Sequence, residues 1–184
     1  MIHFILGGAR SGKSSFAEQQ VIKLANNHDK QAVYIATASV IDVEMENRIA
    51  KHQHDRGDNW QLIECPLVLN TVLAQLNDDN IYLLDCLTLW LNNQLYSKHN
   101  STSSEQSQYL QLMVEQLLKS LSSLTVDIFI VSNEVGLGVV PMGESTRLYV
   151  DFCGWLNQGV AKLADKVTLI TAGIPLVIKD NLNN

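Results

Sequence analysis

The chain has 184 residues, 46% of them hydrophobic, and a formal net charge of -6 at pH 7. This length suits one domain over residues 1–184 with a well-buried core. An acidic chain lacks the overall positive field that binds a nucleic-acid backbone, so we expect no nucleic-acid partner. We also expect a cytoplasmic protein with no transmembrane segment. The apolar runs are too short to cross a bilayer, and the start of the chain lacks the pattern of an export signal.

The first motif in chain order is a glycine-rich phosphate-binding pattern. Residues 3–6 are an apolar run that predicts a buried strand, and the apolar spacing of residues 15–27 predicts a helix. Between them lies the run Gly7-Gly8-Ala9-Arg10-Ser11-Gly12-Lys13-Ser14. It matches the pattern G-x-x-x-x-G-K-[ST] at every fixed position, with Gly7, Gly12, Lys13 and Ser14. The order of strand, loop and helix directs backbone N–H groups and a helix N-terminus to a phosphate. The flanking strand and helix therefore argue against the alternative interpretation, in which the pattern is a chance match in a Gly/Ser-rich turn.

This loop predicts that the chain binds a nucleoside triphosphate. We expect Lys13 to reach the β- and γ-phosphates and the Ser14 hydroxyl to bind Mg²⁺. A second metal ligand is predicted at Asp85, which directly follows the apolar strand pattern of residues 81–84. In P-loop enzymes an acid at this place holds Mg²⁺, directly or through water. A turn or cap residue is the alternative, and the phosphate loop favours the metal role.

The rest of the chain alternates predicted strands and helices. Further strands are predicted at residues 32–35, 60–64, 81–84, 126–131, 167–170 and 176–178. Helices are predicted at residues 42–53, 69–76, 86–90, 110–121 and 148–163, and an exposed Ser-rich loop at residues 98–106. This alternation predicts an α/β fold, with a mostly parallel sheet and helices on both faces.

Two arginines and a histidine recur at helical spacing between the second and third predicted strands. A continuous helix would place Arg48, His52 and Arg56 on one face. The two guanidinium groups would then disfavour protonation of His52 and leave it neutral and nucleophilic near pH 7. They could also grip the phosphates of a nucleotide. Spacing alone favours the simpler interpretation, a solvated helix face with ordinary ion pairs.

Asn133-Glu134-Val135-Gly136 follows the predicted strand at residues 126–131. This is the place where doubly wound sheets bind ligands. Glu134 could orient or deprotonate a substrate hydroxyl there, or it could cap the loop. The spacing of the residues does not decide between these roles.

Longer patterns extend over nearly the whole chain beyond the phosphate loop. They are Phe16-Ala17-Glu18, Tyr34-Ile35-Ala36-Thr37, Arg48-Ile49-x-x-His52-x-x-x-Arg56-x-x-x-Trp60, Leu83-Leu84-Asp85-Cys86-Leu87-Thr88-Leu89-Trp90-Leu91, Asn133-Glu134-Val135-Gly136-Leu137-Gly138-Val139-Val140-Pro141, Gly154-Trp155-Leu156-Asn157-Gln158 and Ala172-Gly173-Ile174-Pro175. Together they resemble the bifunctional adenosylcobinamide kinase/adenosylcobinamide-phosphate guanylyltransferase family of cobalamin biosynthesis. The patterns around His52 and Asn133 are far more specific than the phosphate loop.

The resemblance implies a RecA-like P-loop fold, a homotrimer and two reactions on a corrinoid substrate. In the first, ATP or GTP phosphorylates the aminopropanol hydroxyl of adenosylcobinamide. In the second, GMP passes from GTP to that phosphate, giving adenosylcobinamide-GDP and pyrophosphate. His52 matches the histidine that carries GMP covalently in the family, so the resemblance overrides the interpretation that spacing alone favours. We accordingly predict catalytic roles for His52, Lys13 and Glu134, and nucleotide binding by Arg48, Arg56, Asp85 and the phosphate loop.

Two positions depart from the family pattern. Gly57 stands where the family commonly has proline, and Tyr149-Val150-Asp151 stands where it commonly has Phe-Arg-Asp. If the missing arginine contacts nucleotide or a neighbouring subunit, Arg147 or another residue must replace it. Two alternative functions stay open at this point. One is a small-molecule kinase without the transferase step, and the other is a nucleotide-switched RecA-like regulatory ATPase.

Overall fold

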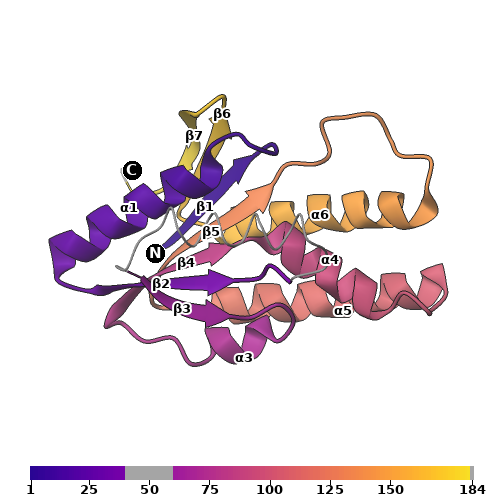
Figure 1. The fold of residues 1–184 in the computed structure, drawn as a ribbon, viewed down its shortest axis with the longest axis horizontal. Helices are drawn as coiled ribbons and strands as arrows, with labels where there is room; N and C mark the ends of the chain where they lie inside the picture. Colours follow the sequence, from indigo (N-terminus) through magenta and orange to yellow (C-terminus); the bar gives the residue numbers. More distant parts are fainter. Residues whose placement is uncertain (40–59, 183–184) are drawn as a thin grey trace.

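The computed structural model describes residues 1–39 and 60–182. In this part of the chain, seven strands form one sheet in the order β3-β2-β4-β5-β1-β6-β7 (Figure 1). Their bounds are β1 Ile2–Gly7, β2 Gln31–Ala36, β3 Trp60–Glu64, β4 Asn80–Asp85, β5 Asp127–Asn133, β6 Lys166–Thr171 and β7 Ile174–Asp180. Neighbouring strands are parallel except β6 and β7, which are antiparallel. The predicted mostly parallel sheet is confirmed.

The strand order brings several chain segments to the carboxyl edge of the sheet. β5 lies between β1 and β4, and the register pairs Gly7 with Asn133 and Val131 with Asp85. β2 ends on the other side of β4, where Ala36 pairs with Asp85. The phosphate loop therefore opens beside the ends of β4 and β5, at the edge where open α/β sheets bind ligands.

Helices cover both faces of the sheet, as the alternation predicts (Figure 1). α1 (Lys13–His28) lies on one face and buries Ala17, Val21 and Ala25 against alternate residues of the central strands. The opposite face packs against α3 (Leu69–Leu73), α4 (Leu87–Ser97), α5 (Ser103–Ser122) and α6 (Glu144–Leu163). β1 is buried along its whole length because it has apolar helices on both sides.

Several predicted helix boundaries on this second face are wrong. α3 ends at Leu73 and not at residue 76, and α6 begins at Glu144 and not at residue 148. The sequence predicts that α4 ends near Trp90, but the helix continues to Ser97, because its later residues Leu91, Asn93 and Gln94 are also buried. The sequence predicts an exposed loop over residues 98–106, but α5 already begins at Ser103, so the last four of these residues are helical. Thr102 and Glu105 cap that helix reciprocally, with each side chain bonded to the other residue's backbone N–H. The predicted helix at residues 42–53 lies outside the described residues.

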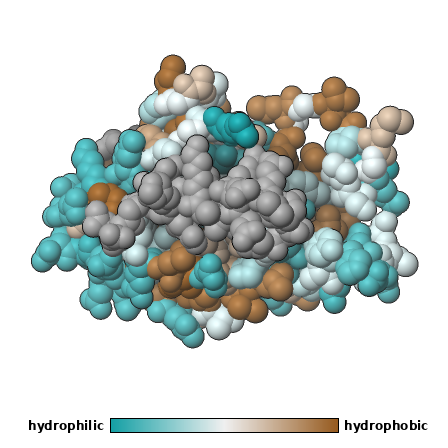
Figure 2. Space-filling view, viewed as in Figure 1, coloured by the Kyte–Doolittle hydropathy of each residue, from teal (hydrophilic) through white to brown (hydrophobic). Residues whose placement is uncertain are grey.

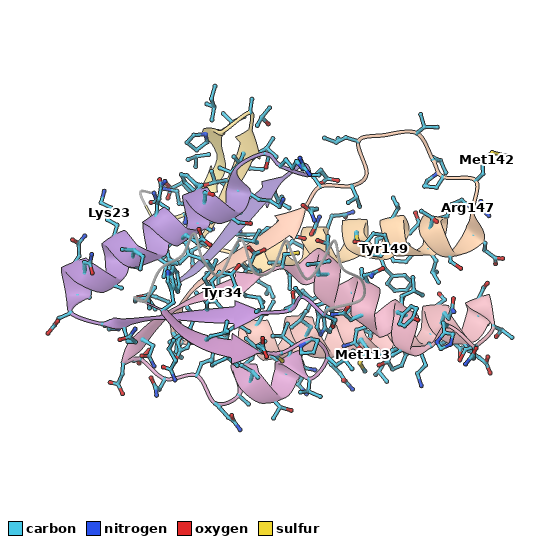
Figure 3. The ribbon with its side chains drawn as sticks, viewed as in Figure 1. Lys23, Tyr34, Met113, Met142, Arg147 and Tyr149 are labelled. Atoms are coloured by element: carbon cyan, nitrogen blue, oxygen red, sulfur yellow. The ribbon has the colours of Figure 1, made fainter. Side chains whose placement is uncertain are left out.

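The connection between β5 and α6, residues 134–143, carries exposed apolar side chains (Figure 2). Leu137 is 87% exposed, Val139 95% and Met142 97%. Arg147 in the first turn of α6 donates hydrogen bonds to the carbonyl oxygens of Pro141 and Met142, which fixes the end of this β5–α6 loop (Figure 3). The loop therefore presents apolar surface close to the carboxyl edge of the sheet.

Candidate functional site

The phosphate loop turns tightly between β1 and α1. Arg10 has φ 56° and Gly12 has φ 91°, so the chain twice enters the left-handed region before the helix begins. A Cβ on Gly7 would lie 2.4 Å from Ser11 Oγ and 2.6 Å from the Ile170 carbonyl oxygen. Only glycine fits this position, because the loop folds back on β1 and on the neighbouring strand β6. The motif glycines thus meet steric requirements of the turn.

Lys13 lies at the start of α1 with its side chain directed back over the loop. The residue is 8% exposed, and its ammonium group donates a hydrogen bond to the Gly8 carbonyl oxygen at 3.1 Å. The loop itself is exposed at Gly8, Ala9 and Arg10. This arrangement holds a positive charge over backbone that is open to an approaching anion, as phosphate binding requires.

The turn between β6 and β7 supports the phosphate loop from the side. The Gly173 N–H donates to the Ser11 carbonyl oxygen at 2.9 Å, and a Cβ on Gly12 would lie 3.5 Å from Gly173 Cα. Gly173 has φ 78° and Ala172 has φ 51°, so the turn needs the left-handed region twice. Sequence reasoning identified the turn but missed this contact, because the contact depends on β6 lying beside β1.

Asp85 ends β4 with its carboxylate held from the neighbouring strand. The Tyr34 hydroxyl of β2 donates to Asp85 Oδ2 at 2.8 Å, and the Thr37 N–H donates to the Asp85 carbonyl oxygen at 3.1 Å. Side chains alternate along β4, and Ile81 and Leu83 face α1. Asp85 therefore belongs to the face of the sheet that α1 covers, and Ser14 lies in the first turn of α1.

The end of β5 is fixed by a network of polar side chains. The Ser132 hydroxyl donates to Asn157 Oδ1 at 2.7 Å, and the Asn157 amide donates to the Asn133 carbonyl oxygen at 3.0 Å. The Asn133 amide in turn donates to the Thr88 hydroxyl of α4 at 2.8 Å. α4 and α6 are thereby both tied to β5 next to the phosphate loop. The sequence drew attention to Asn133 but gave no sign of its partners.

Glu134 makes local contacts in the described structure. Its backbone N–H donates to the Gly7 carbonyl oxygen at 3.1 Å, and its carboxylate accepts a hydrogen bond from the Gly136 N–H at 2.8 Å. The first bond places the residue beside the phosphate loop, and the second is the bond of a loop-capping residue. Its catalytic role stays a prediction.

The cysteines near the carboxyl edge are protonated thiols at neutral pH. Burial raises the pKa of Cys86 to about 11, and the Asp85 charge contributes to the shift. Burial likewise raises the pKa of Cys153 to about 12. A thiol must lose its proton to act as a nucleophile, so these two groups are unsuited to covalent catalysis.

Three of the predicted site residues lie outside the described residues, and two further positions considered in the sequence lie in α6. Arg48, His52 and Arg56 lie in residues 40–59, which are not among the described residues. Val150, at the position of the family's usual arginine, belongs to α6. Arg147, considered as its replacement, donates a hydrogen bond to the β5–α6 loop.

Within the two described ranges, residues 1–39 and residues 60–182, no helix is both long and apolar enough to cross a membrane.

A family model described as cobinamide kinase / cobinamide phosphate guanyltransferase matches residues 3–178. Two relatives are similar over nearly their whole length. A bifunctional adenosylcobalamin biosynthesis protein CobP from Pseudomonas aeruginosa is 44% identical over 97% of this chain and 98% of the relative. A bifunctional adenosylcobalamin biosynthesis protein CobU from Salmonella typhimurium is 34% identical over 97% of this chain and 100% of the relative.

Among solved structures, an ATPase domain is similar in fold. The superposition has a TM-score of 0.54 with 14% sequence identity, and it covers 98% of this chain and 77% of that domain. At this identity the likeness concerns the fold alone. The expected RecA-like P-loop fold is therefore confirmed.

Proposed function

The chain belongs to the cobinamide kinase / cobinamide phosphate guanyltransferase family, and on this premise we propose that it phosphorylates adenosylcobinamide and then transfers GMP to the product. The observation that carries the proposal is the family match over residues 3–178. The phosphate loop beside the ends of β4 and β5 supports it, because both reactions consume a nucleoside triphosphate. ATP or GTP serves the first reaction, and GTP serves the second.

In the first reaction the aminopropanol hydroxyl attacks the γ-phosphorus of the nucleotide. A bond forms between the alcohol oxygen and phosphorus, and the bond from phosphorus to the nucleoside diphosphate breaks. Lys13 offsets the negative charge on the β- and γ-phosphates, and the backbone N–H groups of residues 8–14 orient them. Glu134, next to Gly7 at the end of β5, is our candidate to accept the alcohol proton.

Ser14 and Asp85 fit a Mg²⁺ ion by their chemistry and their placement. Magnesium prefers oxygen ligands, and these residues supply a hydroxyl and a carboxylate. They come from α1 and from the face of β4 that α1 covers. Bound Mg²⁺ would neutralise charge on the triphosphate during transfer. Ser14 and Asp85 would hold the ion, and Lys13 would bind the same phosphates from the loop.

In the second reaction we assign the nucleophile to His52. A neutral imidazole nitrogen attacks the α-phosphorus of GTP, a nitrogen–phosphorus bond forms, and pyrophosphate leaves. The phosphate of adenosylcobinamide phosphate then attacks the same phosphorus and releases the imidazole. Arg48 and Arg56 bind the phosphates and disfavour protonation of His52. Support for this step is the family match and the Arg48-x-x-x-His52-x-x-x-Arg56 spacing.

Two product assays test the proposal on the purified chain. Adenosylcobinamide with γ-labelled ATP or GTP is expected to give labelled adenosylcobinamide phosphate. Adenosylcobinamide phosphate with α-labelled GTP is expected to give labelled adenosylcobinamide-GDP and unlabelled pyrophosphate. Product in the first assay alone would establish a kinase without the transferase step. Nucleotide hydrolysis without either product would instead indicate a regulatory ATPase, and both results contradict the proposal.

We also propose that the chain assembles as a homotrimer, as the family resemblance implies. Support comes from the apolar side chains exposed on the β5–α6 loop and on β7, among them Leu137, Val139, Met142, Ile174 and Leu176. Apolar side chains exposed in this number are unfavourable in water, and such residues are often covered by another subunit. Light scattering should give three times the mass of the chain, whereas the mass of one chain would contradict the trimer.

A further inference from the structure

The Tyr34 hydroxyl is placed where it can control the orientation of Asp85. The two residues come from adjacent strands, and the register pairs Tyr34 with Leu83 and Ala36 with Asp85. Tyr34 is thus the diagonal neighbour of Asp85, a separation that an aromatic side chain can bridge. The bond between the Tyr34 hydroxyl and Asp85 Oδ2 is 2.8 Å long. It is a hydrogen bond to a charged acceptor, which is a strong class of hydrogen bond.

The Tyr34 ring is itself held firmly. The residue is 4% exposed and belongs to the apolar cluster beneath α1. Its ring meets the Trp60 ring edge to face, with 5.6 Å between the centroids (Figure 3 labels Tyr34). A side chain packed in this way has few alternative rotamers, so its hydroxyl is a fixed point. Asp85, at the end of β4, is more accessible than Tyr34.

We propose that Tyr34 is a positioning residue for the metal-binding carboxylate of Asp85. By holding Oδ2 it fixes the orientation of the carboxylate, which would bind the Mg²⁺ that accompanies the nucleotide. This inference rests on the proposed function, in which Asp85 and Ser14 hold that ion. Outer partners of metal ligands commonly orient them in this way, and their loss typically weakens metal binding by about 10–100-fold.

Tyr82 provides a matched control for removal of the hydroxyl. It lies on β4, is 2% exposed, and donates through its hydroxyl to the Asn77 carbonyl oxygen at 3.1 Å. Asn77 precedes β4, so this bond lies at the opposite end of the strand from Asp85. Tyr34→Phe and Tyr82→Phe therefore remove the same group from equally buried tyrosines of the same sheet. Only the first hydroxyl contacts Asp85.

The experiment measures binding of a non-hydrolysable ATP analogue with Mg²⁺ and with EDTA, using calorimetry on the full chain. We expect Tyr34→Phe to reduce the gain in affinity from Mg²⁺ by about 10-fold while leaving the affinity in EDTA unchanged. Tyr82→Phe is expected to leave both affinities as in wild type. Electron paramagnetic resonance with Mn²⁺ should show the same loss of metal affinity in the Tyr34→Phe complex. Thermal unfolding verifies that each variant is folded.

Asp85→Asn separates failure of this inference from failure of the proposed metal site. One outcome is that Asp85→Asn loses the gain in nucleotide affinity from Mg²⁺ while Tyr34→Phe keeps that gain. In that case the positioning role of Tyr34 is wrong, and the metal role of Asp85 is supported. If Asp85→Asn also keeps the gain, the metal role of Asp85 is wrong, and the inference falls with it. In the Asp85→Asn background, Tyr34→Phe is expected to have no further effect, because it acts through the carboxylate. A further loss in that background would contradict the inference.

Discussion

The Asn133 amide donates a hydrogen bond to the Thr88 hydroxyl at 2.8 Å, which joins the last residue of β5 to the first turn of α4. Thr88 lies three residues after Asp85, so the bond links the two strand ends that flank the proposed nucleotide site. Asn157 of α6 fixes the same strand end through Ser132 and the Asn133 carbonyl oxygen. The carboxyl edge is thus held in place by buried polar contacts as well as by packing.

Removal of the Asn157 side chain should therefore loosen the end of β5. We expect Asn157→Ala to lower the free energy of unfolding by about 1–3 kcal/mol, because it leaves buried groups of Ser132 and Asn133 without partners. Nucleotide affinity should fall as well. Urea unfolding and calorimetry measure the two effects. Gln158→Ala, which changes an exposed residue of the same helix, is the control. Equal stability of the two variants would contradict the structural role of Asn157.

Replacement of Lys13 tests the phosphate site directly. Lys13→Ala removes a charge-assisted contact to phosphate, and such bonds contribute about 1.5–3 kcal/mol. Nucleotide affinity should fall by about 10–100-fold. Lys23→Ala is the control because Lys23 lies on the same helix and points to solvent (Figure 3). If Lys13→Ala bound nucleotide with the wild-type affinity, this result would contradict the prediction that the loop binds the nucleotide phosphates.

Two glycine substitutions should change stability in opposite directions. Gly7→Ala places a Cβ against Ser11 Oγ and the Ile170 carbonyl oxygen, so the phosphate loop must shift away from β6. We expect a loss of about 1–3 kcal/mol, as in an overpacked core. A Cβ on Gly154 in α6 meets nothing within 4 Å, so Gly154→Ala should gain about 0.5–1 kcal/mol from helix propensity. Thermal unfolding of both variants checks the two signs, and a stable Gly7→Ala protein would contradict the steric explanation.

His3 should make the fold sensitive to acid. Burial, with a contribution from the Lys166 charge, lowers the pKa of His3 to about 4. In the unfolded chain the histidine binds its proton near pH 6.5, so between these values the unfolded state holds more protons. The stability due to neutral His3 is therefore present above about pH 6.5 and is lost as the pH falls toward 4, by about 3 kcal/mol.

The measurement for His3 is the free energy of unfolding as a function of pH. His3→Gln removes the titrating group and offers a polar partner to Thr168, whose hydroxyl lies 2.9 Å from His3 Nε2. We expect this variant to have a flatter pH profile between 4 and 6.5 than the wild type. An unchanged profile would show that the acid sensitivity arises from other groups.

Local patterns predicted much of the fold, whereas contacts across the sheet could not be predicted. The phosphate loop and the strand before Asp85 are contiguous motifs, and the structure places both at the carboxyl edge. The bond from Tyr34 to Asp85 depends on β2 lying beside β4, and the contact of Gly173 with Ser11 depends on β6 lying beside β1. The order of the strands in the sheet cannot be predicted from any single segment of the sequence. Both contacts are therefore known only from the folded structure.

One wrong prediction had a readable signal. Thr102-Ser103-Ser104-Glu105 has the spacing of a capping box, which marks the start of a helix. The Ser-rich composition of residues 98–106 instead favoured a loop. In the structure both hydrogen bonds of the capping box are formed, and α5 begins at Ser103. A specific capping pattern is therefore a better guide to a helix start here than average composition.

We propose that one chain carries two reactions and that only the second uses His52 as a nucleophile. The measurement is labelling with α-labelled GTP together with both product assays, on wild type and on folded His52→Asn. Wild type should form a GMP adduct that is acid-labile and alkali-stable, as a phosphoramidate is. His52→Asn should still phosphorylate adenosylcobinamide, but it should form neither the adduct nor adenosylcobinamide-GDP, because direct phosphoryl transfer needs no covalent intermediate. Production of adenosylcobinamide-GDP by His52→Asn at the wild-type rate would contradict the role of His52 as the nucleophile.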